Sequence, residues 1–231
     1  QVLQSYLAGR WIGATPAQAL RHAVNGQRVA CTHAESADFG EAVDYARRVA
    51  LPKLLALDFQ QRASRLKALA KYLNERKEAL YAVSAWTGAT RADGWIDIEG
   101  GTGTLFSYAS VGSAELPAQM CTSPQNVYVP RGGVAVHINA FNFPVCGLLE
   151  KFAPSFLAGM PCIGKPATAT SYLTEALVRL INESGILPEG ALQLVIGSTG
   201  DLLDQLDERD VVTFTRTADT AAKLRVHPNL V

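Results

Sequence analysis

Residues after Gly133 alternate between short apolar segments of strand type and longer segments of helix type. The strand-like segments are 134–139, 161–165, 192–197 and 211–215, and the helix-like segments are 145–159, 171–185, 201–207 and 219–226. The strand-like segments are apolar at consecutive positions, which is typical of strands buried on both sides of the pleat. Parallel strands joined by helices bury both faces in this way. The sequence therefore predicts a doubly wound α/β fold, with a mainly parallel sheet and helices on both faces.

The first 113 residues are expected to form an N-terminal, mainly helical part of the same domain, after an irregular start. Apolar residues recur at helical spacing over 38–50 and 60–88. A third helix is expected over 93–108, although its glycines weaken the pattern.

Residues 114–132 are expected to form a shortened arm or loop, because Pro117, Pro124 and Pro130 fall in or beside it. An extended piece is expected at 126–129. Residues 133–231 then form the α/β nucleotide-binding core.

The composition argues against several classes of partner. The 21 Lys and Arg residues equal the 21 Asp and Glu residues, so no overall field would attract nucleic acid or an anionic membrane. No apolar run is long enough to cross a bilayer, and the start lacks the order of a signal peptide. The four cysteines and four histidines show no metal-ligand spacing. We expect a cytoplasmic protein without a metal site.

Polar, small or cationic residues gather where the four predicted strands end. These ends are residues 139–144, 165–168, 197–200 and 215–217. Ligands bind at such ends in parallel sheets, where helix N-termini present free N–H groups. Taken singly, each end also has a purely structural interpretation: the glycines form turns, Lys165 lies at the surface, and Pro166 interrupts the chain. The strict G-x-G-x-x-G pattern of dinucleotide-binding proteins is absent.

The first of these ends raises a question, because "HINAFNFP" places Asn139 and Asn142 among apolar residues. A buried carboxamide without partners costs roughly 1–3 kcal/mol. Either these side chains tie down a turn, which is a common role of asparagine, or one of them meets a ligand.

Several motifs together resemble the cofactor-binding domain of the aldehyde dehydrogenase superfamily. These are "NAFNFP", "GKPATAT", "LPEGALQLVIGSTGD" and "VVTFTRTADTAAKLR", in this order. With "TGATRADGWIDIEGGTGTLFSYAS" included, the chain is similar in particular to the branch of this superfamily that acts in the aerobic breakdown of phenylacetate and benzoyl-CoA. That branch oxidises a CoA-linked semialdehyde with NADP and is sometimes fused to an enoyl-CoA hydratase domain. The resemblance runs over nearly the whole chain from about Tyr6.

The resemblance implies roles for individual residues. Asn142 matches the residue whose carboxamide N–H helps to form the oxyanion hole. Lys165 matches the lysine that reaches the adenosine ribose or its 2′-phosphate, and Thr168 stands where NAD-preferring relatives often have a glutamate that repels that phosphate. NADP is the expected cofactor, with NAD as the alternative. The implied cofactor-binding residues are Ala140, Phe141, Lys165, Ala167, Thr168, Gly197, Gly200, Thr215, Arg216 and Thr217.

The chain departs from the family pattern beside the pyrophosphate. Arg216 and Thr217 stand where the family commonly has glycine and serine. Arg216 has three interpretations: it binds phosphate, it blocks the site, or it points to solvent.

The chain also ends before the region where the family places its general-base glutamate and nucleophilic cysteine. The catalytic domain is therefore expected to be absent from this chain, and the chain alone is expected not to oxidise aldehydes. Cys146 follows Asn142 closely, but a free cysteine in a first helical turn is expected to pack as a small apolar residue.

Two functions remain open at this stage. The first is the cofactor-binding part of an NADP-dependent aldehyde dehydrogenase that forms a homo-oligomer in its full-length form and acts on a small-molecule aldehyde. The second is a noncatalytic module that binds a nucleotide or CoA.

Overall fold

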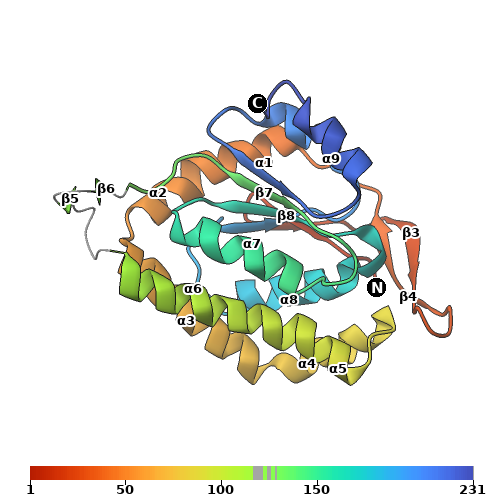
Figure 1. The fold of residues 1–231 in the computed structure, drawn as a ribbon. Coiled ribbons are helices and arrows are strands. Elements are labelled where there is room, and N and C mark those ends of the chain that lie inside the picture. Colours follow the sequence, from red (N-terminus) through yellow and green to blue (C-terminus); the bar gives the residue numbers. More distant parts are fainter. Residues whose placement is uncertain (117–121, 124–125, 128, 231) are drawn as a thin grey trace.

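The computed structural model describes residues 1–116, 122–123, 126–127 and 129–230, and its centre is a six-stranded sheet (Figure 1). The strand order is β10-β7-β8-β9-β1-β2. The four strands β7 to β10 pair in parallel, and β1 and β2 extend the sheet antiparallel at one edge. The strands are β1 (Ser5–Leu7), β2 (Arg10–Ile12), β7 (Ala135–Ile138), β8 (Cys162–Lys165), β9 (Leu192–Leu194) and β10 (Val211–Phe214). The predicted mainly parallel sheet is confirmed.

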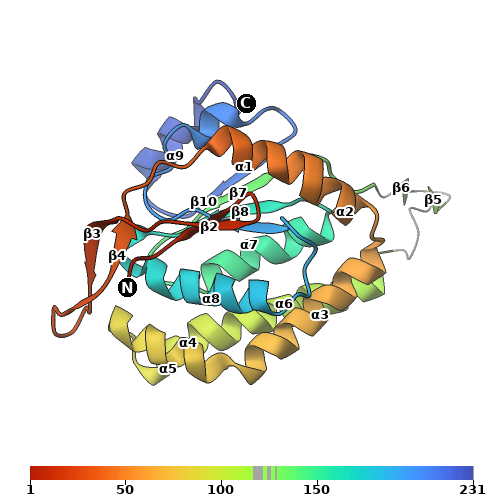
Figure 2. The same cartoon turned by 180° about the vertical axis from the view of Figure 1, so that it is seen from behind.

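Helices cover both faces of this sheet, as predicted (Figures 1 and 2). One face carries α1 (Phe39–Tyr45), the short helix η5 (Leu202–Gln205) and α9 (Ala218–Arg225). The other face carries α7 (Cys146–Leu157) and α8 (Ser171–Glu183). An outer layer packs on these two helices, formed by α3 (Phe59–Glu75), α4 (Lys77–Ser84), α5 (Arg91–Gly94) and α6 (Gly100–Glu115).

Strand β7 shows how the sheet divides the core in two. Val134, Val136 and Ile138 pack in the cluster that contains Phe39 and Val43 of α1. Ala135, one position out of phase, packs in the cluster under α7. This alternation follows from the period of two residues along a strand, and it buries apolar residues on both faces.

The start of the chain, expected to be irregular, is instead built of strands. Tyr6 pairs with Leu194, which joins β1 to the parallel part of the sheet. Strands β3 (Pro16–Arg21) and β4 (Arg28–His33) form a separate two-stranded sheet. Three-residue strands such as "SYL" and "RWI" are too short to show periodicity, so tertiary pairing determines them.

Two of the predicted helices are divided in the structure. The helix expected over 60–88 is interrupted at Arg76, between the end of α3 at Glu75 and the start of α4 at Lys77, and a 3₁₀ turn over Ala85–Thr87 follows α4. The segment 93–108 begins with α5, passes through a π-helical turn, η3 (Trp95–Glu99), and continues as α6. The glycines that weakened this prediction allow close packing, because a Cβ on Gly101 would lie 3.0 Å from the Cα of Cys146 in α7.

The remaining elements link these layers. Helix α1 continues through a π-helical turn, η1 (Ala46–Ala50), into α2 (Leu51–Leu55), and a 3₁₀ turn, η4 (Thr168–Thr170), precedes α8. Short strands β5 (Thr122–Ser123) and β6 (Asn126–Val127) pair with each other in the expected arm. The rest of the arm, residues 117–121, 124–125 and 128, lies outside the described residues, as does Val231.

Arg62, in α3, is fully buried and donates to backbone carbonyls of two other helical segments. Its Nε donates to Leu157 O at 2.8 Å, and its Nη1 donates to Leu54 O at 2.9 Å and to Leu57 O. Leu157 ends α7 and Leu54 lies in the last turn of α2, so the guanidinium meets the negative ends of two helices. Burial lowers the pKa of Arg62.

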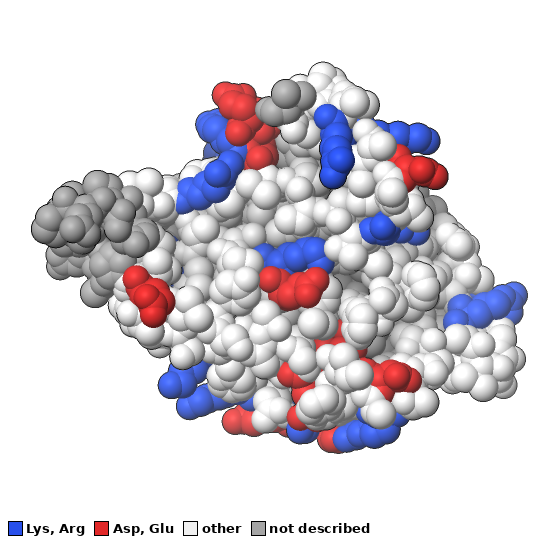
Figure 3. Space-filling model, viewed as in Figure 1, with Lys and Arg blue, Asp and Glu red and all other residues white. Residues whose placement is uncertain are grey.

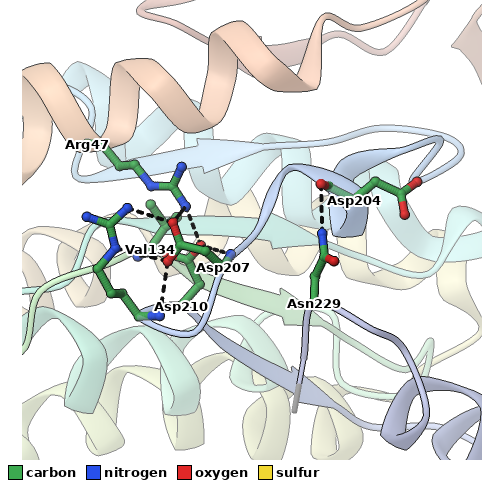
Figure 4. A network of polar contacts seen from close by, with 7 residues as sticks. Arg47, Val134, Asp204, Asp207, Asp210 and Asn229 are labelled. Atoms are coloured by element: carbon green, nitrogen blue, oxygen red, sulfur yellow. Dashed lines mark hydrogen bonds and ion pairs between the residues drawn. The ribbon is translucent and has the colours of Figure 1, made fainter.

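A second polar network lies where β7 and β10 begin (Figure 4). Arg47 Nη2, from η1, lies 2.8 Å from Asp207 Oδ2 and 2.5 Å from Asp210 Oδ2. Asp210 Oδ1 accepts from Val134 N at 2.7 Å. The network thus fastens the starts of two parallel strands to the helix that covers them, at the end of the sheet away from the predicted site.

Candidate nucleotide site and asparagine loop

The carboxyl ends of the parallel strands meet in one row, as the sequence predicted. Ile138 of β7 pairs with Lys165 of β8 on one side and with Phe214 of β10 on the other. These three residues line a cavity of about 620 Å³ on the α1 face of the sheet. Further walls come from η5 and α9, through Leu203 and Leu224.

The cavity has a cationic wall. Among the described residues that line it, Lys165 and Arg216 are the Lys and Arg residues, and none is Asp or Glu. Lys165 is buried, and within the described residues its Nζ donates one hydrogen bond, to Pro166 O at 2.9 Å. Burial, together with the charge of Arg216, lowers the pKa of Lys165 to about 8. A negatively charged ligand would therefore relieve a repulsion between two cations.

Four of the predicted cofactor-binding residues line this cavity, namely Lys165, Thr168, Gly197 and Arg216. Gly200 lines an adjacent cavity of about 400 Å³, which shares Gly197 with the first. The other predicted residues, Ala140, Phe141, Ala167, Thr215 and Thr217, do not line the larger cavity. Thr215 N donates to Ile138 O at 3.0 Å, and Thr217 is the N-cap residue of α9.

The N-terminal strands supply a further wall of the cavity, which was not predicted from the sequence. Gln18 of β3 and Thr32 and His33 of β4 also line the cavity. Thr32 Oγ1 accepts from Gln18 N at 3.1 Å, so this wall is internally bonded. Nothing in the local sequence indicated it, because the segment was expected to be irregular.

Asn139 does not tie down a turn with its side chain in the part of the chain that the structure describes. Asn139 is buried, and both polar atoms of its amide lack a hydrogen-bond partner among the described residues. Its Cβ lies 3.8 Å from where a Cβ on Gly147 would be, so it faces the first turn of α7. Asn142 is exposed, in the loop between β7 and α7. The interpretation of the Asn139 side chain as a turn-forming group is therefore wrong.

Other side chains hold the loop that carries Asn142. Thr170 Oγ1 donates to Phe141 O at 3.0 Å, and Thr174 Oγ1 donates to Pro144 O at 2.9 Å. Both threonines lie on or just before α8 and are buried. The backbone on both sides of Asn142 is thus fixed by hydroxyl groups from the next helix.

Asp97 completes this support from the outer layer of helices. Its carboxylate accepts from Val145 N at 3.1 Å and from Cys146 N at 2.7 Å, which caps the N-terminus of α7. Burial raises its pKa to about 6, although the two amide donors act in the opposite direction. The one available signal was an acidic residue within the apolar stretch "WIDI".

Cys146, the cysteine beside this loop, is half-buried. Burial, followed by the charges of Glu150 and Asp97, raises the pKa of its thiol to about 11. A thiol in this state is a weak nucleophile at neutral pH. The expected packing role of Cys146 fits this environment.

Two buried groups, His137 and Asp97, should change the free energy of unfolding in opposite directions as the pH is lowered. Burial lowers the pKa of His137 from 6.5 to about 4, so between these values the unfolded chain binds a proton that the folded chain does not. Stability should fall by about 2–3 kcal/mol over this window as the pH is lowered. Asp97 has a raised pKa, so between pH 6 and 3.8 the folded chain takes up its proton first and gains stability.

Urea denaturation of single variants from pH 7 to pH 4 separates the two contributions. His137→Gln should lose less stability on acidification than the wild type, and Asp97→Asn should lose more. Parallel pH profiles for all three proteins would contradict the assignment.

Charge and metal-ligand patterns add no further site in the described residues. On the face shown in Figure 3, Lys and Arg residues are interspersed with Asp and Glu, and no large area carries one sign of charge. Within the described ranges, no group of three or more His, Cys, Asp or Glu residues could hold a metal ion. No described helix is both long enough and apolar enough to cross a bilayer.

Solved structures with the same fold include two enzymes that match almost all of the chain. An NADP-dependent enzyme from E. coli superposes with a TM-score of 0.82 at 25% identity, over 96% of this chain and 48% of that one. A betaine aldehyde dehydrogenase from Staphylococcus aureus, in complex with NAD+, superposes with a TM-score of 0.80 at 22% identity, over 96% of this chain and 47% of that one. The second likeness shows the fold alone.

Sequence comparison gives the family. A curated relative, a 3,4-dehydroadipyl-CoA semialdehyde dehydrogenase from Aromatoleum evansii, is 40% identical over 244 residues, which cover 99% of this chain and 47% of the relative. The chain therefore spans about half the length of this relative. The model of the aldehyde dehydrogenase family matches residues 13–228. This match covers most of the chain and confirms the predicted resemblance, so the chain belongs to the aldehyde dehydrogenase family.

Proposed function

We propose that this chain is the NADP-binding part of an aldehyde dehydrogenase that acts on a CoA-linked semialdehyde. The observation that carries the proposal is the pair Lys165 and Arg216 on a cavity whose described lining contains no carboxylate. Two cations on one cavity wall favour a ligand with a phosphate in addition to the pyrophosphate. The substrate class is supported by the name of the relative that is 40% identical.

The residues present fit a dinucleotide. Lys165, Arg216 and the hydroxyl group of Thr168 would hold the 2′-phosphate. Gly197 has φ +99° and open space where a Cβ would be, so its backbone could approach a phosphate closely. Apolar side chains of Leu203, Phe214 and Leu224 line the same cavity and suit the adenine base.

Asn142 is proposed to act on the aldehyde. NADP, when bound, would accept a hydride from the substrate. The carboxamide N–H of Asn142 would donate to the carbonyl oxygen as negative charge develops on it. The bonds from Thr170, Thr174 and Asp97 to the surrounding backbone support this role, since a donor contributes most when it is held in place beforehand.

Calorimetric titration of the chain with NADP and with NAD tests the proposal. NADP should bind more tightly, and Lys165→Ala should remove the difference, about 1–3 kcal/mol for a charged hydrogen bond. Thr168→Glu should weaken NADP binding by repulsion and leave NAD binding nearly unchanged. NADP affinity of the wild type should fall above pH 8, where Lys165 loses its proton.

The matched control is Lys71→Ala, which removes an exposed lysine from α3 and should leave both affinities unchanged. Arg216→Gly should weaken NADP binding and flatten its salt dependence. Tighter binding by that variant would show that Arg216 obstructs the site. Equal affinities of the wild type for NADP and NAD, or a preference for NAD, would overturn the proposed cofactor.

A further inference from the structure

The surroundings of the Lys165 amine differ from those of three other lysines of the chain, and phosphate binding alone does not require this difference. Lys53, Lys77 and Lys151 form ion pairs with Glu189, Glu99 and Glu150, respectively. Lys165 Nζ instead donates to a backbone carbonyl and lies beside a second cation. A lysine amine is nucleophilic only when it is unprotonated, and burial near another cation favours that state.

The cavity around this amine suits a small anionic electrophile. It measures about 620 Å³, and Arg216 and the hydroxyl-bearing residues Thr168 and Ser198 line it together with Lys165. The absence of Asp and Glu among the described lining residues means that nothing there repels a phosphate. A molecule with a phosphate and an aldehyde could therefore place the first at Arg216 and the second at Lys165.

We propose that Lys165 forms a reversible imine with phosphorylated aldehydes, which thereby occupy the nucleotide cavity. The unprotonated amine attacks the carbonyl carbon, a C–N bond forms, and the oxygen takes up the proton that the nitrogen releases. The resulting carbinolamine loses water to give C=N, and hydrolysis reverses both steps. No oxidant or reductant is needed. Formation of the imine does not depend on which nucleotide the site binds, but competition with NADP rests on the proposed function.

Pyridoxal 5′-phosphate is a probe that carries both groups. The chain is incubated with it, the imine is trapped with borohydride, and the adduct is counted by intact mass and located by peptide mapping. We expect one main adduct, at Lys165, formed about tenfold more readily than with pyridoxal, because the phosphate contributes a charged contact. Lys165→Met should abolish it, Arg216→Met should reduce it, and the control Lys71→Met should not change it.

Two further arms use the unchanged chain, so the test does not depend on the folding of a variant. Inorganic phosphate should slow adduct formation by competing for Arg216, and NADP should protect Lys165. Adducts spread over the exposed lysines, or equal labelling by pyridoxal and its phosphate, would overturn the proposal. If NADP does not decrease the labelling of Lys165, the result would support imine formation and count against the proposed nucleotide site.

Discussion

Arg62→Leu should lower the free energy of unfolding by about 3–5 kcal/mol, because it removes a charged donor from three backbone carbonyl groups. The arginine joins α3 to Leu157 O at the end of α7 and to Leu54 O at the end of α2. Leucine fills part of the volume but donates nothing to these carbonyl groups, and the site is 0% exposed. Urea denaturation followed by circular dichroism measures the change.

The control for this variant is Lys67→Leu, which introduces the same side chain at an exposed position of the same helix. It should change the unfolding free energy by less than about 0.5 kcal/mol, as surface substitutions commonly do. Equal effects of the two substitutions would show that the carbonyl contacts of Arg62 contribute little to stability.

Asp210→Ala should destabilise the fold by about 2–4 kcal/mol, since it removes a buried carboxylate with three partners. Its oxygens accept from Val134 N at 2.7 Å and from Asp207 N at 2.9 Å, and they pair with Arg47. The aspartate side chain is 0% exposed, so water would not replace these contacts without rearrangement. Thermal and urea denaturation should both report the loss, and NADP affinity should change less than stability.

Asp204→Ala is the matched control within the network of Figure 4. Asn229 Nδ2 donates to the backbone oxygen of Asp204, which the substitution keeps. Within the described residues, the substitution removes the contact of the carboxylate with His227 Nε2, and that carboxylate is 65% exposed, so the expected change is below about 1 kcal/mol. A smaller effect of Asp210→Ala than of Asp204→Ala would refute the structural role of Asp210.

The parallel strands could be predicted because each carries its signal locally. Segments such as "VAVHI" are apolar at successive positions, and glycines or prolines mark their limits. The strands β1 and β2 could not be predicted in this way. Each has three residues, and Tyr6 pairs with Leu194, which is far away in sequence, as well as with Trp11.

The residues of the candidate site differ in the same way: those marked by the local sequence could be predicted, and those defined by contacts with distant segments could not. Lys165 ends one predicted strand and Arg216 directly follows another, so the topology alone brought them to one edge of the sheet. Asp97 was missed because its partners, Val145 and Cys146, are nearly fifty residues away in sequence. Contacts between distant segments leave no periodic trace in the segments themselves.

The contact between Asp97 and α7 also limits how this part of the protein could be transferred to another scaffold. Its carboxylate comes from η3, in the outer helical layer, yet it caps α7 beside the asparagine loop in the sheet layer. Leu66 of α3 and Ala135 of β7 belong to one apolar cluster. A unit cut from residues 133–230 would therefore lose both a cap and a wall of its core, and any transplant into another scaffold must include the helices from Phe39 onward.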